Sequence, residues 1–432
     1  MRDYFRLQEN GTSVKIEVTA GITTFLATMY IIVVNPAILS VTGMPFSAVL
    51  TATVMVSAFS SIAMGLYAGN PIVLAPGMGL NAFFAYSIVL GMGVKWETAL
   101  GAVFWSGVLF ILLSVTNVRT AIVRAIPQQL RYAVAAGIGL FIAEIGLINT
   151  KFIIANPSTL ISFGGLNPLT ITFLAGFAVT SFLAVKRVRG ALMLGILFAT
   201  LLAVPIGRWW GTEPVVTYSG LMARPDFSLL LRLDFVGALK WTLWPVIFAM
   251  LFTDMFDSLS TFVGVAEAAD LTDADGQPRA VKRSLIVDGF STLISGLFGT
   301  SAGTSYIESA AGIEEGGRTG LTAVVAGLLF LPFMFFSPLL SMVPSLATAP
   351  ALVMVGVFMM RPVQKINWAS LDDALPAFLA MILIPLTYSI TQGLVWGFLS
   401  WTFIKLISGK GKEVSIMLWI IDILAVLALF RK

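Results

Sequence analysis

Two acidic residues stand out because they lie in an otherwise apolar segment, 253-TDMFDSLST-261. Asp254 and Asp257 are three residues apart, so they share one face of a helix, which Ser258 and Thr261 extend by one turn. A carboxylate at membrane depth costs about 2.5–3.5 kcal/mol on the mildest scale, so it needs a partner, a proton or a function. Two acids this close repel each other, and at least one is expected to hold a proton, as a proton-coupled site requires.

Glu308 has the strongest case for direct ligand contact. It lies in 299-GTSAGTSYIESAAGIEEGGRTG-320, at the position of a membrane span. This segment opens with small and hydroxyl residues and ends in glycines and charges, which no lipid-facing helix does. Its glycines and its run of Thr and Ser weaken a helix.

A second segment, 70-NPIVLAPGMGLNAFFAY-86, breaks helix rules at a related position, because it contains Pro71, Pro76, Gly77 and Gly79. Backbone without helical hydrogen bonds cannot face lipid, where each unpaired group costs several kcal/mol. We therefore expect 71–76 and 301–306 to be short extended pieces that pair with each other.

Each extended piece should lead into a half-helix, starting near Gly77 and Ile307. A half-helix that begins inside the membrane directs free N–H groups and a partial positive charge into the interior. Asn81 and Glu308 fall within about the first turn of these half-helices. Two such segments at related positions favour a binding site over a simple kink.

The composition is that of a polytopic membrane protein. Of 432 residues, 58% are hydrophobic and 11% are charged, against roughly 25% charged in soluble domains. The apolar runs are about 20 residues long and do not alternate, which favours helices over a β-barrel. Cysteine and histidine are absent, so proton chemistry near neutral pH must use carboxylates.

The apolar runs predict fourteen spans with a cytoplasmic N-terminus and no signal peptide. With that orientation the inside segments hold 18 Lys and Arg residues, among them Arg119 and Arg124, and the outside segments hold 6; Arg431 and Lys432 are unassigned. Whether 415–430 also spans is left open. The predicted spans are 18–41, 47–68, 70–91, 97–115, 128–148, 168–185, 190–207, 241–266, 280–298, 300–315, 319–336, 345–360, 374–389 and 391–407.

An internal repeat links 59-FSSIAMGLYAG-69 to 290-FSTLISGLFGT-300 at an offset of 231 residues. Seven predicted spans separate the two copies, so the halves would be inverted relative to each other. Inverted repeats are typical of transporters that bind substrate near the bilayer midplane, where two discontinuous helices meet.

Two other intramembrane acids receive different interpretations. Glu144 lies in 137-GIGLFIAEIGLINT-150 without polar neighbours in sequence, so we interpret it as structural or gating. Asp288, just before the second repeat copy, is expected to bond Ser or Thr hydroxyls or backbone within the bundle.

The motifs 74-LAPGMGLNAFFAY-86, 254-DMFDSLSTFVGVA-266 and 299-GTSAGTSYIESAAGIEEGGRTGLTAVV-325 resemble the signature regions of nucleobase–cation symporters, above all the AzgA-like permeases for adenine, guanine and hypoxanthine. The resemblance implies an all-α fold of fourteen spans in two inverted repeats of seven, with short antiparallel strands in spans 3 and 10. It also implies proton symport and a homodimer. Spans 1–4 and 8–11 would form a core domain, and spans 5–7 and 12–14 a gate domain.

The implied domain boundaries follow from the span positions. They are 1–17 for a cytoplasmic N-terminus, 18–117 and 241–336 for the core domain, 118–207 and 337–407 for the gate domain, 208–240 for an extracellular loop, and 408–432 for a C-terminal tail with an apolar segment.

The resemblance also implies roles for individual residues. Asn81 and Gly79 match the family's span-3 site, Glu308 its span-10 carboxylate and Asp257 its span-8 carboxylate; Asp254 matches the branch's paired acid. Thr261 stands where related uracil and xanthine carriers have a histidine, and FDSLST replaces the usual FDTxGT. Proton coupling is then expected from Asp254, Asp257 and Glu308, with Na⁺ not excluded.

Purine chemistry agrees with these residues. Carboxylates accept from ring and exocyclic N–H groups, and backbone N–H groups and Asn81 satisfy the ring acceptors. Thr304, Ser305 and Thr261 complete the expected site, and Phe84 is a stacking candidate together with Phe83, Tyr306 and Phe256.

We therefore expect a proton-driven purine importer in the plasma membrane, the inner membrane of a bacterium, without a cofactor, a metal site or a nucleic-acid partner. One alternative is an anion transporter or channel on the same fold, for which a Lys or Arg at membrane depth is expected. An integral-membrane enzyme is the third hypothesis and lacks residues to support it.

Overall fold

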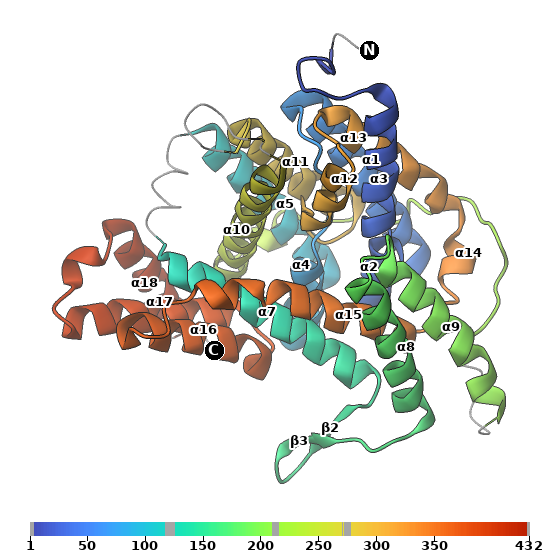
Figure 1. The fold of residues 1–432 in the computed structure, drawn as a ribbon. Helices are drawn as coiled ribbons and strands as arrows, with labels where there is room; N and C mark the ends of the chain where they lie inside the picture. Colours follow the sequence, from blue (N-terminus) through green and yellow to red (C-terminus); the bar gives the residue numbers. More distant parts are fainter. Residues whose placement is uncertain (1–3, 117–125, 210–215, 270, 272–277, 430–432) are drawn as a thin grey trace.

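A computed structural model describes residues 4–116, 126–209, 216–269, 271 and 278–429, which form an almost entirely helical fold (Figure 1). Three basic residues counted in the topology prediction, Arg2, Arg119 and Arg124, lie outside the described residues, as do the unassigned Arg431 and Lys432. The predicted domain segments are therefore described only in part: residues 1–3, 117–125, 210–215, 270, 272–277 and 430–432 lie outside the described residues.

A first group of helices is linked by successive contacts: α3 packs on α2, α11, α13 and α14, and the other members pack on these or on one another. Small residues allow close backbone approach within it: a Cβ on Gly320 would lie 1.9 Å from the carbonyl oxygen of Gly65. We call these helices the first group; they are α1 (Val14–Thr28), α2 (Ile31–Leu39), α3 (Phe46–Ala63), α4 (Met78–Ala82), α5 (Trp96–Val115), α10 (Trp244–Ala269), α11 (Val281–Phe298), α12 (Ala310–Glu314), α13 (Gly320–Phe330) and α14 (Ser337–Leu340).

A second group packs around α7 and α15 and crosses the first in Figure 1. Gly139 of α7 and Gly356 of α15 face each other, and a Cβ on either would lie within 2.7 Å of the other's carbonyl oxygen. The second group comprises α7 (Gln128–Asn149), α8 (Pro168–Val185), α9 (Ala191–Trp209), α15 (Ser345–Met359), α16 (Leu371–Thr387), α17 (Ile390–Ile407) and α18 (Ile416–Leu429).

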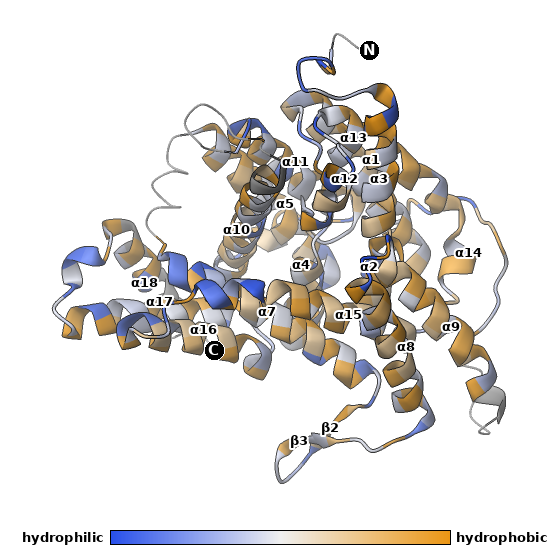
Figure 2. Ribbon diagram, in the orientation of Figure 1, coloured by the Kyte–Doolittle hydropathy of each residue, from blue (hydrophilic) through white to orange (hydrophobic). Residues whose placement is uncertain are grey.

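The helices have the length and composition of membrane spans. Among the described residues, 8 helices are long and apolar enough to cross a bilayer, and shorter apolar helices occur at Met78–Gly91, Ala191–Ile206 and Gly320–Phe335. Apolar residues dominate the helices in Figure 2, and hydrophilic ones gather at helix ends and in loops. The molecule is therefore a helical polytopic membrane protein.

Two spans are interrupted by short strands that pair with each other. β1 (Leu74–Pro76) runs antiparallel to β4 (Gly303–Ser305), with Leu74 opposite Ser305 and Pro76 opposite Gly303. Each strand follows a helix that ends at a glycine in the left-handed region, Gly69 (φ 71°) before β1 and Gly299 (φ 95°) before β4. Such a conformation favours glycine, which has no Cβ to clash.

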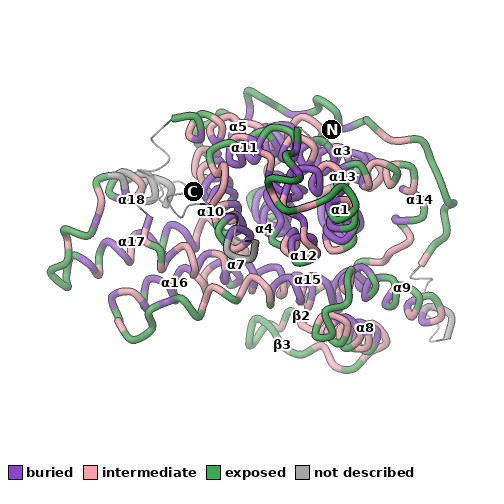
Figure 3. The backbone as a smooth tube through the Cα atoms, turned by 45° about the horizontal axis from the view of Figure 1, so that its top comes forward, coloured by how far each residue is buried: buried purple, intermediate pink, exposed green. Residues whose placement is uncertain are grey.

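Both strands lead directly into short helices. After β1, α4 begins with Gly77 as its N-cap and continues as a π-helical segment, Phe83–Gly91. After β4, a 3-10 turn (Ile307–Ser309), which we call η6, leads into α12. The strand pair and the start of α4 are buried, and Figure 3 shows buried backbone where α1, α3, α4 and α13 pack. Broken backbone is thus shielded from lipid, as it must be. At the start of η6, Ile307 is exposed and Glu308 is partly buried.

The structure also contains a β-hairpin that was not predicted from the sequence. β2 (Ile153–Asn156) pairs antiparallel with β3 (Leu160–Phe163) just after α7. The stretch 153-IIANPSTLISF-163 carries the signal, because two runs with β-branched residues flank an Asn-Pro-Ser-Thr turn. The Leu160 and Phe163 side chains are exposed.

Candidate functional site

Hydrogen bonds just beyond both ends of the paired residues stabilise the β1–β4 strand pair. The Tyr306 backbone N–H donates to the Val73 carbonyl over 2.9 Å, and the Gly77 N–H donates to the Ala302 carbonyl over 2.9 Å. The Tyr306 hydroxyl donates to the Pro76 carbonyl over 2.6 Å. These contacts hold the starts of α4 and η6 at adjacent positions.

Two carboxylates lie beside the helix start that follows β4. Asp257 of α10 and Glu308 of η6 are only partly buried and lie close enough to interact electrostatically. The Tyr30 hydroxyl, at the start of α2, donates to Glu308 Oε1 over 2.8 Å. Asp257 has no hydrogen bond to another described residue. We call Asp257 and Glu308 the front pair; their oxygens retain capacity to accept bonds from a ligand.

Two other acids lie behind the strand β4 and are fully buried. Asp288 of α11 accepts from the Ser258 and Ser305 hydroxyls, the latter over 3.0 Å. Asp254 of α10 accepts from the Thr292 hydroxyl through Oδ2, while its buried Oδ1 has no partner. We call these acids and their hydroxyl partners the rear network.

The hydroxyls expected to bind substrate are engaged in this same network. Thr304 Oγ1 lies 2.9 Å from Ser258 Oγ. Thr261 Oγ1 donates to the Ser305 carbonyl over 3.2 Å, so it joins α10 to β4. Together with the Ser305 bond to Asp288, these contacts position the strand. The hydrogen bonds of these three hydroxyls therefore hold β4 in its position beside α10 and α11.

Asn81 and Gly79 lie on α4, next to the helix start. The Asn81 side chain is completely buried, and its Oδ1 has no hydrogen-bond partner; its Nδ2 lies 3.9 Å from Met78 Sδ. Gly79 has another reason to be small, because a Cβ there would lie 2.5 Å from Cγ2 of Ile138 on α7. Gly79 thus sets how closely the two helix groups approach.

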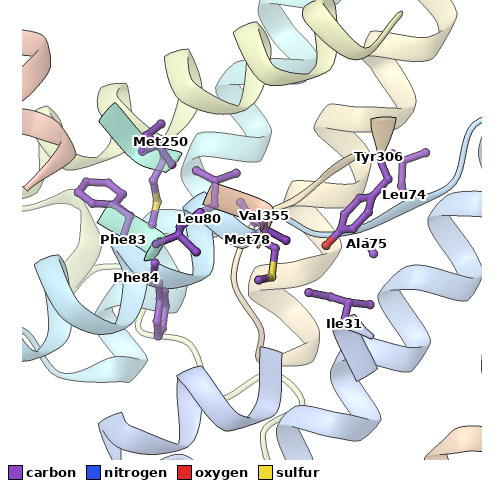
Figure 4. Close-up of a cluster of buried hydrophobic side chains, with 14 of the residues drawn as sticks. Ile31, Leu74, Ala75, Met78, Leu80, Phe83, Phe84, Met250, Tyr306 and Val355 are labelled. Carbon is purple, nitrogen blue, oxygen red and sulfur yellow. The ribbon is translucent and has the colours of Figure 1, made fainter. Parts of the chain in front are cut away.

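The aromatic residues that could stack on a ligand differ in burial and in position. Phe84 and Phe83 have at most 1% exposed area, and Figure 4 shows them beyond Leu80, away from Tyr306. Phe256 is only partly buried, next to Asp257 in the chain, and the Arg131 guanidinium lies 5.6 Å from its ring centroid. Of these aromatic side chains, Tyr306 is the one close enough to interact electrostatically with both acids of the front pair.

Two residues that sequence reasoning missed support the site. Tyr30 bonds Glu308 from 278 positions away in the chain. Asn35 of α2 is buried and donates to the Thr53 and Thr300 hydroxyls over 2.7 Å each, tying α2 and α3 to the approach to β4. A lone Asn within the apolar run 30-YIIVVNPAIL-39 was the available signal.

The arrangement offers acceptors and donors at the two helix starts that the strand pair joins. The front pair supplies carboxylate oxygens, the start of α4 supplies backbone N–H groups without helical partners, and Asn81 supplies an unpaired amide oxygen. Such a set fits a neutral, planar ligand with both N–H groups and acceptors. Among the described residues there is no group of three or more acidic side chains that could hold a metal ion.

The helical membrane fold has a counterpart among solved structures. It superimposes on the transmembrane domain of a cyanobacterium bicarbonate transporter, BicA, with a TM-score of 0.67, covering 89% of this chain and 97% of that one. At 17% identity the likeness concerns the fold alone.

The family follows from sequence. The model Xan_ur_permease, described as the Permease family, matches residues 15–395, and the chain belongs to this family. It is 41% identical to the adenine permease AdeP of Escherichia coli K12, over 98% of this chain and 94% of that protein. It is 43% identical to the guanine/hypoxanthine permease PbuG of Bacillus subtilis 168, over 96% of each.

Proposed function

We propose that this chain imports purine nucleobases, namely adenine, guanine or hypoxanthine, by proton symport. Two kinds of support converge. The curated relatives at about 40% identity are named for these bases. The candidate site combines carboxylate acceptors with unpaired donors, which is the complement of a purine edge.

The membrane arrangement is part of the proposal. Fourteen spans in two inverted repeats of seven would place the N-terminus in the cytoplasm and 208–240 outside. The equivalent order of glycine, strand and short helix at β1 and β4 supports the repeat. The first helix group would be the core domain, 18–117 with 241–336, and the second the gate domain, 118–207 with 337–407. The functional unit would be a homodimer.

The mechanism assigns different tasks to the acids. Glu308 and Asp257 clamp the N–H groups of the base, and Asn81 with the α4 N–H groups meets its opposite edge. Asp254 or Asp257 carries the coupling proton; the unpartnered, buried Oδ1 of Asp254 supports this, since a lone carboxylate in that place is costly. Movement of the core domain against the gate domain would then carry base and proton together.

One observation carries the proposal: the β1–β4 pair brings Glu308 next to Asp257 at the start of a half-helix inside the membrane. A likeness in fold to a bicarbonate transporter does not favour the anion alternative. The front pair is acidic, and no Lys or Arg forms an ion pair with it among the described residues.

The test is uptake of labelled hypoxanthine, guanine and adenine by cells that lack their own carriers, with and without a protonophore. We expect uptake that the protonophore abolishes. Uptake that ignores the protonophore would reject coupling, and no uptake of any purine would reject the substrate class.

A matched pair of variants locates the site. Glu308→Gln should abolish uptake without disturbing membrane insertion. Glu315→Gln is the control, because Glu315 lies at the end of α12, where it pairs with Arg189 and is partly exposed. Equal loss in both variants would contradict the assignment of Glu308.

A further inference from the structure

The helix α7 meets the first helix group on one face and its own group on the other. Ile138 packs against Gly79 of α4. On its other side, Gly137 and Gly146 bring α7 close to the carbonyl oxygens of Met381 and Ala349, within 3.0 Å of where a Cβ would stand. α7 therefore lies at the interface across which the two groups would move.

Tyr388 lies at this interface, beside the C-terminal half of α7. It occupies the left-handed region (φ 52°) between α16 and α17, which is unusual for a non-glycine residue. Its carbonyl accepts a hydrogen bond from the Ser87 hydroxyl of the first group. Its ring packs edge-on against Phe141 of α7, with centroids 5.3 Å apart.

Glu144 lies at the same contact. It is three residues after Phe141 and so shares its face of α7. Tyr388 is close enough to interact electrostatically with Glu144 and with Tyr86, the neighbour of Ser87. Glu144 Oε2 is buried without a hydrogen-bond partner, and no described Lys or Arg forms an ion pair with Glu144.

No described Lys or Arg pairs with Glu144 at this end of α7, where the nearest cation in the chain, Lys151, is exposed. α4 and α15 have no ionisable residue, and Tyr86 and Tyr388 are the titratable neighbours. The remaining charged residues on or beside elements that contact α7 are Arg131 at its opposite end, Lys151 beyond its last turn, Asp254 and Asp257 of α10, Asp372 and Asp373 of α16 with Lys405 of α17, and Arg361 and Lys365 of the turn after α15.

Glu144 is only partly buried as a residue, but its Oε2 is buried and receives no hydrogen bond. Because a carboxylate in a membrane span without a donor or a cation is costly, the closed contact favours the neutral form of Glu144. Separation of Ser87 from Tyr388 would admit water and allow ionisation. We propose that Glu144 is a second proton-binding site, loaded when α7 and Tyr388 close on Ser87 and emptied when this contact opens. The inference rests on the proposed function only in requiring that the two helix groups move.

The absence of cysteine from the chain makes a direct test available. Ser87→Cys, in purified protein in detergent, reports opening of the contact through its rate of maleimide labelling. Ser158→Cys, in the exposed turn between β2 and β3, corrects for the intrinsic pH dependence of the thiol. After correction, labelling of Ser87→Cys should rise with pH, by at most about tenfold per pH unit for one linked proton.

The rise should vanish in Glu144→Gln, where labelling stays low at every pH, and persist in Glu144→Asp. Glu144→Leu is a second neutral variant and should behave as Gln does. An undiminished rise in both neutral variants, or no corrected rise with Glu144 present, would overturn the proposal. Labelling needs no substrate, so failure here leaves purine transport untouched, and failure of purine uptake leaves this test valid.

Discussion

The front pair and the rear network contain the same chemical groups in different surroundings. Asp254 and Asp257 are three residues apart on α10, yet one is fully buried and bonded to Thr292, and the other is partly exposed without a hydrogen bond to a described residue. Asp288 and Glu308 also differ in burial, since Asp288 is fully buried between two serine hydroxyls, whereas Glu308 is partly buried and accepts from the Tyr30 hydroxyl.

The difference teaches that an acid in a membrane span is not by itself a ligand. A fully buried carboxylate that accepts from protein hydroxyls, as Asp288 does, holds the backbone in place, whereas a partly exposed one with unfilled acceptor sites can receive a ligand. We interpret the rear network as the support that keeps β4 extended and presents the front pair.

The largest effect is expected from deleting the centre of the rear network. Asp288→Ala leaves the Ser258 and Ser305 hydroxyls without their acceptor, which should cost about 2–5 kcal/mol of stability. Asp257→Ala deletes an equivalent group from the front pair and should change stability by less than about 1 kcal/mol. Thermal unfolding of the purified proteins measures both changes in stability. Equal losses of stability in the two variants would contradict the distinction between the rear network and the front pair.

A change in the front pair should affect binding instead. Asp257→Asn replaces an acceptor-only group with one that presents a donor, so a charge-assisted bond is lost. This loss should weaken hypoxanthine binding by about 10–100-fold, equivalent to about 1.4–2.7 kcal/mol, at unchanged stability. Isothermal titration with the purified protein measures it, and unchanged affinity would remove Asp257 from the site.

An intermediate effect is expected where the site meets the second helix group. Gly79→Ala would place a Cβ 2.5 Å from Ile138 Cγ2, and the resulting overpacking should cost about 1–3 kcal/mol. Adding Ile138→Ala should recover most of this loss. A double-mutant cycle on thermal stability and hypoxanthine affinity measures the coupling between Gly79 and Ile138. If the two substitutions had additive effects, contact with Ile138 would not be the reason for glycine at position 79.

The smallest effect is expected from Thr261→Val, which removes one hydrogen bond to the Ser305 carbonyl and should cost about 0.5–1.5 kcal/mol of stability. Thr253→Val is the matched control, because the buried Thr253 hydroxyl has no partner. Affinity for hypoxanthine should stay within about threefold in both variants. Abolished binding in Thr261→Val alone would assign Thr261 to the substrate instead of to the strand.

The interruption of the two spans could be predicted from sequence because proline, glycine and clustered hydroxyls act locally on a helix. Gly77 and Ile307 were predicted near the starts of the half-helices, and the short helices begin at Met78 and Ile307. The pairing of 71–76 with 301–306 was also expected, and the strands occupy Leu74–Pro76 and Gly303–Ser305.

The division of labour among the polar residues could not be predicted, because it depends on contacts between distant segments. That Thr261, Thr304 and Ser305 contact substrate stays a prediction. Their hydrogen bonds to neighbouring segments could not be read from the sequence. Tyr30 was missed for the same reason, since its partner Glu308 lies in the other half of the chain.

Hypoxanthine affinity of the Asn and Gln variants in both acid pairs tests the central claim most directly. The account predicts that Asp257→Asn and Glu308→Gln each weaken binding by about 10-fold or more, while Asp254→Asn, which keeps an oxygen for Thr292, binds as the unmodified protein does. Lost binding in Asp254→Asn with normal binding in both front-pair variants would contradict it.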